Sequence, residues 1–545
     1  MRAAYRRWAP AGAIALLALA GSITSLFSDF TYDDRGVIFE NERVHALGNL
    51  AHQFLETYWP AKLGGDGYRP IVLWMFTVQW VVGHGSPMLF HGVNILLTVA
   101  TSIAVFYCAS SILPTLGAWV AAALFAVHPV HVEVTGNIVG QSELVVALCL
   151  ALAIGIYLRG RNAHALTGRS VAMISALFAV GLLSKEHAIV LPGVLFAAEL
   201  TVLRGEPWRD RAAATRLLAL SLLMIALAYL GLRGLVQRDL AGFQPYPIFR
   251  FLNMSAVDRV GTMMNEMPRI AQLLVFPTHL SADYSPTEVV VASGPDLSQL
   301  PGVFICVGTV ILSVVLRSSA PVASFGLLWL IISFLPVSNL IVPAGFVTAE
   351  RTLFFPSIGV VLVAGSVAQY VKERASPRGR RIAVGAVAVL LMLGLARSID
   401  RQRVWKNNDT FFYALMKDAP NGYRAHFMHA RHVGLRSHLQ EMEKEYRRAI
   451  RIFPYDASMT TAIADAYTRA GFYKPAADLF EWTFTVSPTS GDGRYQYVYC
   501  LAKLNRWRDV RKEALNGLRY APPREVHLLR EAVRQANISL GLPHL

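Results

Sequence analysis

The chain has 545 residues, of which 54% are hydrophobic and 16% are charged, and its mean hydropathy is +0.41. A soluble domain carries about 25% charged residues, so this composition excludes a wholly soluble enzyme, and it equally excludes an intrinsically disordered chain. The 51 basic against 36 acidic residues give a net charge of +15. In a membrane protein this excess follows from basic loops kept in the cytoplasm, so we expect no nucleic acid partner.

Charged residues are about twice as frequent from Arg401 onward as before it. Long apolar runs are confined to the first part of the chain. We therefore expect a multi-span membrane domain over residues 1–400 and a soluble domain over residues 401–545.

The first apolar run follows a basic flank and covers residues 11–27. We interpret it as an uncleaved span, with a signal peptide cleaved near Ala18-Leu19-Ala20 as the alternative. A span needs about 20 apolar residues. Ten further apolar stretches follow, several of them shorter than this, and they bring the expected number of spans to about eleven. These stretches cover residues 89–112, 116–127, 142–158, 170–183, 187–203, 215–233, 301–316, 321–342, 353–371 and 382–399.

Three basic loops, at residues 159–169, 204–216 and 372–381, should lie in the cytoplasm. They share one side only if residues 70–83 form an interfacial helix and the run before Pro277 is re-entrant or surface-lying. The remaining loops then share the outer face with everything after Arg401. These outer loops are residues 29–88, 128–141, 184–186, 234–300 and 343–352.

The first outer loop carries two adjacent carboxylates, Asp33 and Asp34, next to Arg35. Unpaired carboxylates close to a membrane are costly, so these two should hold a partner or perform chemistry. The residues alone leave three roles open: a general base toward a hydroxyl, a ligand to a divalent cation, or an ion pair with Arg35.

The second outer loop holds His128, His131 and Glu133, followed by Gln141. Histidines at this spacing across a proline match no known zinc pattern. We therefore favour either hydrogen bonding to a polar substrate or the capping of a helix end over a metal site.

Two cations in later loops are candidates for binding an anion. Lys185 precedes Glu186, and Arg351 follows Glu350, so mutual neutralisation is the alternative in both cases. For Arg351 a side chain that snorkels to the membrane surface is a further alternative. Arginine in particular binds phosphate through two parallel hydrogen bonds. The fourth loop adds a polar segment that contains Asp283 and Tyr284.

These loops combine paired carboxylates, two cationic positions and several hydrogen-bonding groups beside a helical bundle. This combination suits a lipid phosphate that arrives from the bilayer and a water-soluble acceptor from outside. No Walker loop, GxGxxG, HExxH or GxSxG element occurs, so ATP and cytosolic nucleotide sugars are not indicated.

The C-terminal part contains prolines that recur every 34 residues, at 420, 454, 488 and 522. This is the period of tetratricopeptide repeats, in which stacked helical hairpins form a concave binding surface. In the clearest repeat, Gly471 corresponds to Ser437 in the preceding repeat and to Asn505 in the following one. We expect the array to bind a peptide or protein, with a stalk or an oligomer contact as the alternative.

Seven motifs in a fixed order, followed by the repeats, resemble the transmembrane and tetratricopeptide-repeat O-mannosyltransferases, which are glycosyltransferases of the GT-C class. The motifs are Tyr32-Asp-Asp34 with Ile38 and Asn41, Arg69-Pro70, Phe90-His91 with Asn94, the run from Leu124 through His131 to Glu133, Leu183-Ser-Lys-Glu186, the run from Phe276 to Ser285, and Glu350-Arg with Pro356-Ser357.

The resemblance implies an all-α GT-C bundle followed by a tetratricopeptide-repeat solenoid. It also implies transfer of a sugar, mannose by analogy, from a polyprenyl-phosphate carrier to a hydroxyl of a protein acceptor, with inversion. The catalytic role then falls on Asp33 as base, with Asp34 in support. The positions expected to bind substrate are Arg69, His91, His128, His131, Glu133, Gln141, Lys185, Glu186, Asp283, Tyr284, Glu350 and Arg351.

One position departs from the family, which typically reads Gly-Arg where this chain has Gly140-Gln141. Nothing in the sequence requires a metal, although a divalent cation stays open. We expect a bacterial cytoplasmic membrane with the site and repeats facing the periplasm, or the equivalent lumenal face of the endoplasmic reticulum. Rival hypotheses are a transferase acting on a glycan or lipid, and a non-enzymatic membrane scaffold.

Overall fold

The computed structural model describes residues 2–60, 65–164, 166–237, 254–341, 343–344, 346–434 and 438–543. Within these ranges the regular elements are helices and no strand occurs, which confirms the all-α class. The chain forms two compact units. The first comprises Met1–Gln244, Val260–Tyr284 and Pro295–Asp418, and the second comprises Pro245–Arg259, Ser285–Gly294 and Ala419–Leu545.

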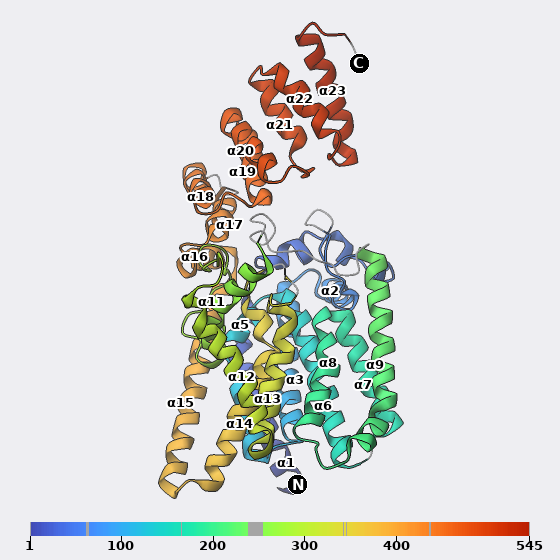
Figure 1. Ribbon diagram of the computed structural model, residues 1–545, viewed down its shortest axis with the longest axis vertical. Helices are drawn as coiled ribbons and strands as arrows, with labels where there is room; N and C mark the ends of the chain where they lie inside the picture. Colours follow the sequence, from blue (N-terminus) through green and yellow to red (C-terminus); the bar gives the residue numbers. More distant parts are fainter. Residues whose placement is uncertain are drawn as a thin grey trace. The chain divides into compact units, whose positions relative to one another are not determined.

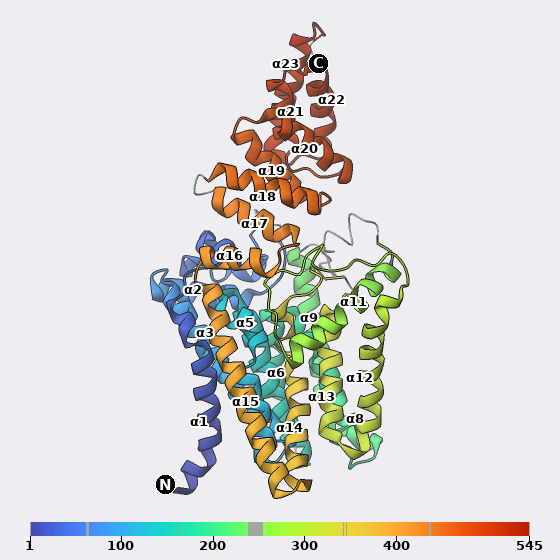
Figure 2. The same ribbon diagram turned by 90° about the vertical axis from the view of Figure 1, so that its left-hand side faces the viewer.

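The first unit is a bundle of long helices that run side by side (Figures 1 and 2). A helix coincides with each of the eleven predicted spans, and the outer loops lie at the end of the bundle opposite the N-terminus. These helices are α1 (Arg2–Ser22), α3 (Pro87–Ala109), α4 (Thr115–Ala126), α6 (Gln141–Asn162), α7 (Gly168–Ser184), α8 (Leu191–Leu200), α9 (Trp208–Gln237), α12 (Leu300–Ser319), α13 (Pro321–Phe334), α14 (Pro356–Arg374) and α15 (Pro377–Gln402).

In the described part of the chain, six helices are long and apolar enough to cross a membrane on their own, which is the pattern of a multi-pass membrane protein. A seventh candidate is the bent pair formed by Thr115–Ala126 and Pro129–Gly136. Shorter apolar helices include Gly168–Ser184 and Pro321–Val337. The total of eleven spans stays a prediction.

Glycines bring α14 into backbone contact with two neighbours. Gly359 of α14 faces Gly326 of α13, and Gly365 of α14 faces Gly117 of α4. A Cβ at any of these four positions would overlap the carbonyl oxygen of the glycine opposite. Small residues at such contacts let membrane helices approach closely, so α14 is held tightly on two sides.

Two helices lie with the loops at the outer end of the bundle. Helix α2 (Pro70–Gly83) has the predicted position of the interfacial segment, and its Trp74 is exposed. Helix α11 (Ala256–Val275) buries Met263, Met267, Ile270 and Leu274 along one face. A single apolar stripe at this helical spacing is typical of a helix that lies along a surface.

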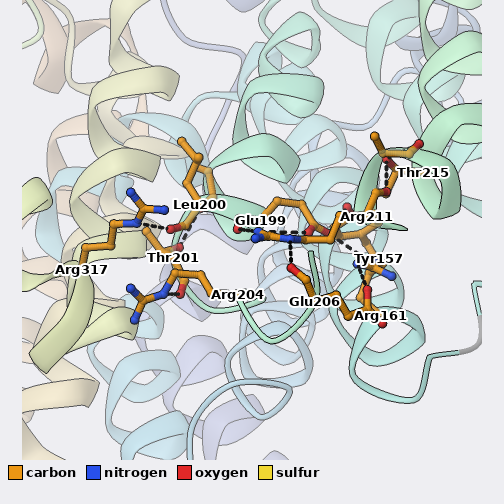
Figure 3. Close-up of polar contacts among 12 residues, drawn as sticks. Tyr157, Arg161, Glu199, Leu200, Thr201, Arg204, Glu206, Arg211, Thr215 and Arg317 are labelled. Atoms are coloured by element: carbon orange, nitrogen blue, oxygen red, sulfur yellow. Dashed lines mark hydrogen bonds and ion pairs between the residues drawn. The ribbon is translucent and has the colours of Figure 1, made fainter. Parts of the chain in front are cut away.

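The opposite end of the bundle is held by an ion network between two of the basic loops (Figure 3). Buried Arg161 at the end of α6 pairs with Glu199 of α8 at 2.8 Å and with Glu206 at 2.7 Å. The hydroxyl of Tyr157 donates to Glu199 at 2.7 Å, and Arg211 of α9 donates to the Glu199 carbonyl at 2.6 Å. The network therefore fastens α6, α8 and α9 together.

The second unit contains paired helices. They are α17 (Tyr423–Gly434) with α18 (Leu439–Ile452), α19 (Ala457–Arg469) with α20 (Tyr473–Val486), α21 (Arg494–Lys503) with α22 (Trp507–Gly517), and α23 (Pro523–Ser539). The four periodic prolines all fall in connections before a new pair or before α23. Gly471 and Asn505 both adopt a positive φ at the turn within their hairpins, at 82° and 57°. Ser437 lies outside the described residues, and assignment of the hairpins to the tetratricopeptide class stays a prediction.

Candidate functional site

The five predicted outer loops contact one another at one end of the first unit. The part of the fourth loop at residues 238–253 lies outside the described residues. Each loop is joined to another by a hydrogen bond or ion pair: Asp34 with Val139, Arg69 with Glu186, Arg351 with Glu133, and Ser281 with Glu350.

Asp34 connects the first loop to the second. Its side chain is fully buried, and its carboxylate accepts hydrogen bonds from the backbone N–H of Val139 at 2.9 Å and of Thr31 at 3.2 Å. Burial raises the pKa of Asp34 to about 8, although these backbone donors oppose the shift. Asp34 therefore fixes the two loops to each other, and its carboxyl group is not accessible from the surface.

Asp33 lies beside Asp34 but is only partly buried. It interacts electrostatically with the guanidinium of Arg351, which comes from a loop more than 300 residues away in the sequence. The two neighbouring carboxylates thus have different environments, and of the two only Asp33 keeps part of its surface exposed.

Arg351 is anchored by Glu133 of the short helix α5 (Val132–Gly136). The Glu133 carboxylate accepts from Arg351 Nη1 at 2.6 Å and from the Arg351 backbone N–H at 2.8 Å. Glu133 is 3% exposed, whereas the Arg351 side chain keeps 30% of its surface exposed. The arrangement fixes the guanidinium and leaves it partly open to a ligand.

The residue before Arg351 has a different role. Glu350 is buried, and its carboxylate accepts from the hydroxyl of Tyr284 at 2.8 Å and from the N–H of Ser281 at 2.6 Å. Burial raises the pKa of Glu350 to about 8 and that of Tyr284 well above its usual value. Partly buried Asp283 lies in the same turn. These contacts join the fourth loop to the fifth.

Two further cations, Arg69 and Lys185, belong to the same cluster of charged side chains as Asp33, Glu133 and Arg351, which we call the charged region. Arg69 pairs with Glu186 at 3.0 Å, and buried Lys185 pairs with Glu143 of α6. Burial opposes ionisation of Glu186, but Arg69 and Lys185 hold its pKa at about 2. Lys185 therefore forms its ion pair with Glu143 and not with its neighbour Glu186, which was the alternative to anion binding.

Tyr58 was not among the residues predicted from the sequence. It is 1% exposed, its ring lies 4.8 Å from the Arg69 guanidinium, and its hydroxyl has no hydrogen-bond partner in the part of the chain that the structure describes. It interacts electrostatically with Arg69, Asp33 and Arg351. A tyrosine in a long polar loop carries no sequence pattern that marks such a position.

Four predicted residues are occupied by other contacts. Gln141 exchanges two hydrogen bonds of 2.8 Å with Gln79 of α2. Each of the three histidines has a nearby oxygen as its partner: the Asp29 carbonyl for His91 at 3.5 Å, the Leu274 carbonyl for His128 at 3.0 Å and the Ser357 hydroxyl for His131 at 2.8 Å. The charged region is instead formed by Asp33, Glu133, Glu143, Arg69, Lys185, Glu186 and Arg351.

No group of three or more His, Cys, Asp or Glu side chains able to hold a metal ion occurs among the described residues. The carboxylates of the charged region pair with Arg or Lys, as for Glu133, Glu186 and Glu143.

An apolar cavity of about 450 Å³ lies among the ends of α4 and α11 and the helices α14 and α15. Leu124, Leu274, Val361 and Leu393 contribute to its walls, and half of the Leu393 side chain is exposed. Polar atoms come from His128, Thr278 and Arg397, which lie at the loop end of these helices.

The search against protein-family models found no match. The chain is similar to curated proteins over most of its length. It is 24% identical to protein O-mannosyl-transferase TMTC3 of Homo sapiens over 95% of this chain and 60% of the relative. It is 25% identical to protein O-mannosyl-transferase TMTC1 of Homo sapiens over 83% of this chain and 56% of that protein. The predicted family resemblance is confirmed.

The chain spans about three fifths of the length of these relatives. Among solved structures it is similar to the archaeal oligosaccharyltransferase AglB from Archaeoglobus fulgidus, solved in complex with an inhibitory peptide and a dolichol-phosphate. That similarity has a TM-score of 0.47 at 14% identity and covers 83% of this chain and 60% of the other.

Proposed function

We propose that this chain is an inverting glycosyltransferase that moves a sugar, mannose by analogy with its relatives, from a polyprenyl-phosphate carrier to a protein hydroxyl. The observation that carries the proposal is the electrostatic interaction between a partly exposed carboxylate, Asp33, and a partly exposed cation, Arg351, that Glu133 anchors. The relatives named protein O-mannosyl-transferases support the same reaction class.

In this proposal Asp33 is the general base. It takes the proton of the acceptor hydroxyl while that oxygen forms a bond to the anomeric carbon from the face opposite the phosphate. The bond between the anomeric carbon and the phosphate oxygen breaks, and its electron pair leaves with the polyprenyl phosphate. A positioned base of this kind contributes about 10²- to 10⁴-fold to a rate.

Arg351 is the proposed partner of the departing phosphate. Glu133 holds one edge of its guanidinium, and the exposed remainder offers further N–H donors. Developing negative charge is stabilised most by donors that are already in place before the reaction. Arg69 and Lys185 add positive potential, but their side chains are only 16% and 10% exposed, against 30% for Arg351, so they are weaker candidates for direct contact.

The apolar cavity supports a lipid carrier. It opens at the surface of the bundle, as the exposed face of Leu393 shows, and its polar atoms lie at the loop end. An isoprenoid chain matches the apolar walls. The phosphate stays assigned to Arg351, because Arg397 at the loop end of the cavity already pairs with Asp400 at 3.0 Å. We propose that part of the carrier's chain lies in this cavity.

The remaining assignments complete the proposal. The loop end faces the exterior, because the basic loops at the other end favour the cytoplasm. The helical hairpins of the second unit present or select the protein acceptor. The membrane is the bacterial cytoplasmic membrane, with the endoplasmic reticulum as the alternative.

The test uses detergent-purified protein, radiolabelled polyprenyl-phosphate-mannose and an extract of secreted proteins. We expect label to enter protein with the wild type and to fall at least 100-fold with Asp33→Asn. The matched control is Glu42→Gln, an exposed carboxylate of the same loop, which should retain wild-type activity.

Each other result changes the proposal in a defined way. Label from a different polyprenyl-phosphate sugar would correct the donor, and label in a glycan or lipid fraction would correct the acceptor. Full activity of Asp33→Asn would refute the role of Asp33. No transfer from any donor would favour the scaffold hypothesis.

A further inference from the structure

The loop that carries Asp33 is held by a segment that comes near the end of the first unit in the sequence. This segment, residues 402–412, contains the end of α15, a helical turn at Arg403–Lys406 and the start of α16 (Asn408–Asp418). The backbone N–H of Asp29 donates to the Lys406 carbonyl at 2.8 Å, and the hydroxyl of Thr31 donates to the Trp405 carbonyl at 3.2 Å.

Two further contacts are made at Tyr32, immediately before Asp33. The Tyr32 backbone N–H donates to the side-chain oxygen of Asn408 at 2.8 Å, and its ring stacks on Phe411 with centroids 4.8 Å apart. Tyr32 has a φ of 55°, in the left-handed region that a residue with a Cβ rarely adopts. Such a conformation persists when surrounding contacts enforce it, and Asn408 and Phe411 provide these contacts.

The same segment also contacts the loop that carries Glu133. The Gln402 side-chain amide donates to the hydroxyl of Thr135 at 2.7 Å. Gly136 lies against Trp405 so closely that a Cβ there would be 3.0 Å from the Trp405 Cβ. Residues 402–412 therefore touch both the loop of the proposed base and the helix that anchors Arg351.

We propose that Asn408 and Phe411 are positioning residues that hold Tyr32 in its left-handed conformation and thereby aim Asp33 at the acceptor. This inference rests on the proposed function, in which Asp33 is the base. It assigns a catalytic consequence to residues that contact neither substrate, because a base displaced by about 1 Å loses on the order of 100-fold in rate.

The test measures kcat and KM of the full-length protein for Asn408→Ala and Phe411→Leu. We expect kcat to fall by about 10- to 100-fold, with the KM for the donor unchanged. Asn408→Asp keeps the acceptor oxygen and should retain most of the activity. Tyr413→Leu is the matched control on the same helix, because Tyr413 is 74% exposed, and it should behave as the wild type.

A double-mutant cycle separates positioning from general destabilisation. Asn408 is only partly buried, so Asn408→Ala should fold, and a positioning role predicts that it costs nothing further in the Asp33→Asn background. An equal loss in both backgrounds would overturn the inference. So would wild-type kcat for Asn408→Ala and Phe411→Leu while Asp33→Asn is impaired. Full activity of Asp33→Asn would instead refute the proposed function itself.

Discussion

Replacing Asp34 with Asn should change the pH dependence of stability and leave most of the catalysis intact. Asp34 is fully buried, and its pKa is raised from 3.8 to about 8. A carboxyl whose pKa is higher in the folded than in the unfolded state stabilises the fold below the unfolded value. That contribution is lost as the pH rises through the folded value.

The size of the effect follows from these two pKa values. Between them the folded state holds one more proton than the unfolded state, so Asp34 costs about 1.4 kcal/mol of stability for each pH unit gained. From pH 6 to pH 8 the wild type should lose roughly 2 to 3 kcal/mol through this group. An amide has the shape of the protonated carboxyl and does not titrate, so Asp34→Asn should remove this loss.

The assay is the thermal unfolding midpoint of the detergent-solubilised protein at pH 6, 7, 8 and 9. Glu350, whose pKa is also raised to about 8, contributes the same slope in both proteins and cancels in the comparison. Parallel curves for the wild type and Asp34→Asn would refute the reasoning. Transfer activity of Asp34→Asn should stay within about tenfold of the wild type at pH 7, whereas Asp33→Asn should lose at least 100-fold.

Three further results are expected. Arg351→Ala should lower the unfolding midpoint, because an unpaired buried carboxylate at Glu133 costs about 3 to 5 kcal/mol; adding Glu133→Gln should restore the midpoint but not the activity. Ala364 of α14 lines the apolar cavity. Ala364→Trp, which fills part of that cavity, should raise the KM for a long-chain polyprenyl donor and leave the KM for a short-chain analogue unchanged, as measured by transfer kinetics. A chain ending at Asp418, checked for monodispersity by gel filtration, should hydrolyse the lipid-linked sugar but fail to label protein; equal protein labelling would remove the acceptor role of the second unit.

Membrane topology predicted which loops would meet, because basic loops on one side force the others to share the opposite side. The sequence also marked the two carboxylates and Arg351. The family resemblance favoured Asp33 as the base, but the residues themselves do not separate the two roles, since Asp33 and Asp34 are adjacent and differ only in what the fold places around them. Burial against the N–H of Val139 distinguishes Asp34, and that contact joins residues more than 100 positions apart.

Other residues of the site could not be predicted from the sequence for the same reason: their surroundings are formed only in the folded chain. Gln141 stands where the family typically has a cation, yet its amide is matched to Gln79 on a helix that only the fold brings near. Tyr58 and Asn408 lie in segments without periodicity or motif. Asn408 is placed by its contact with Tyr32, 376 positions away, whereas Tyr58 is placed by the folding of its own loop onto Arg69. A pattern within one segment predicts local structure, whereas the positions of these residues are set by contacts formed only when the chain folds.

The glycine contacts of α14 have a consequence for how a reaction cycle could operate. Arg351 lies just before this helix, whose backbone is fitted against α13 and α4 at two levels. A helix that slid by one residue would move by about 1.5 Å and bring side chains where only hydrogen atoms now fit. Arg351, the residue proposed to bind the phosphate, therefore adjoins a helix that is held against sliding, and we expect opening or closing during turnover to involve loops rather than α14.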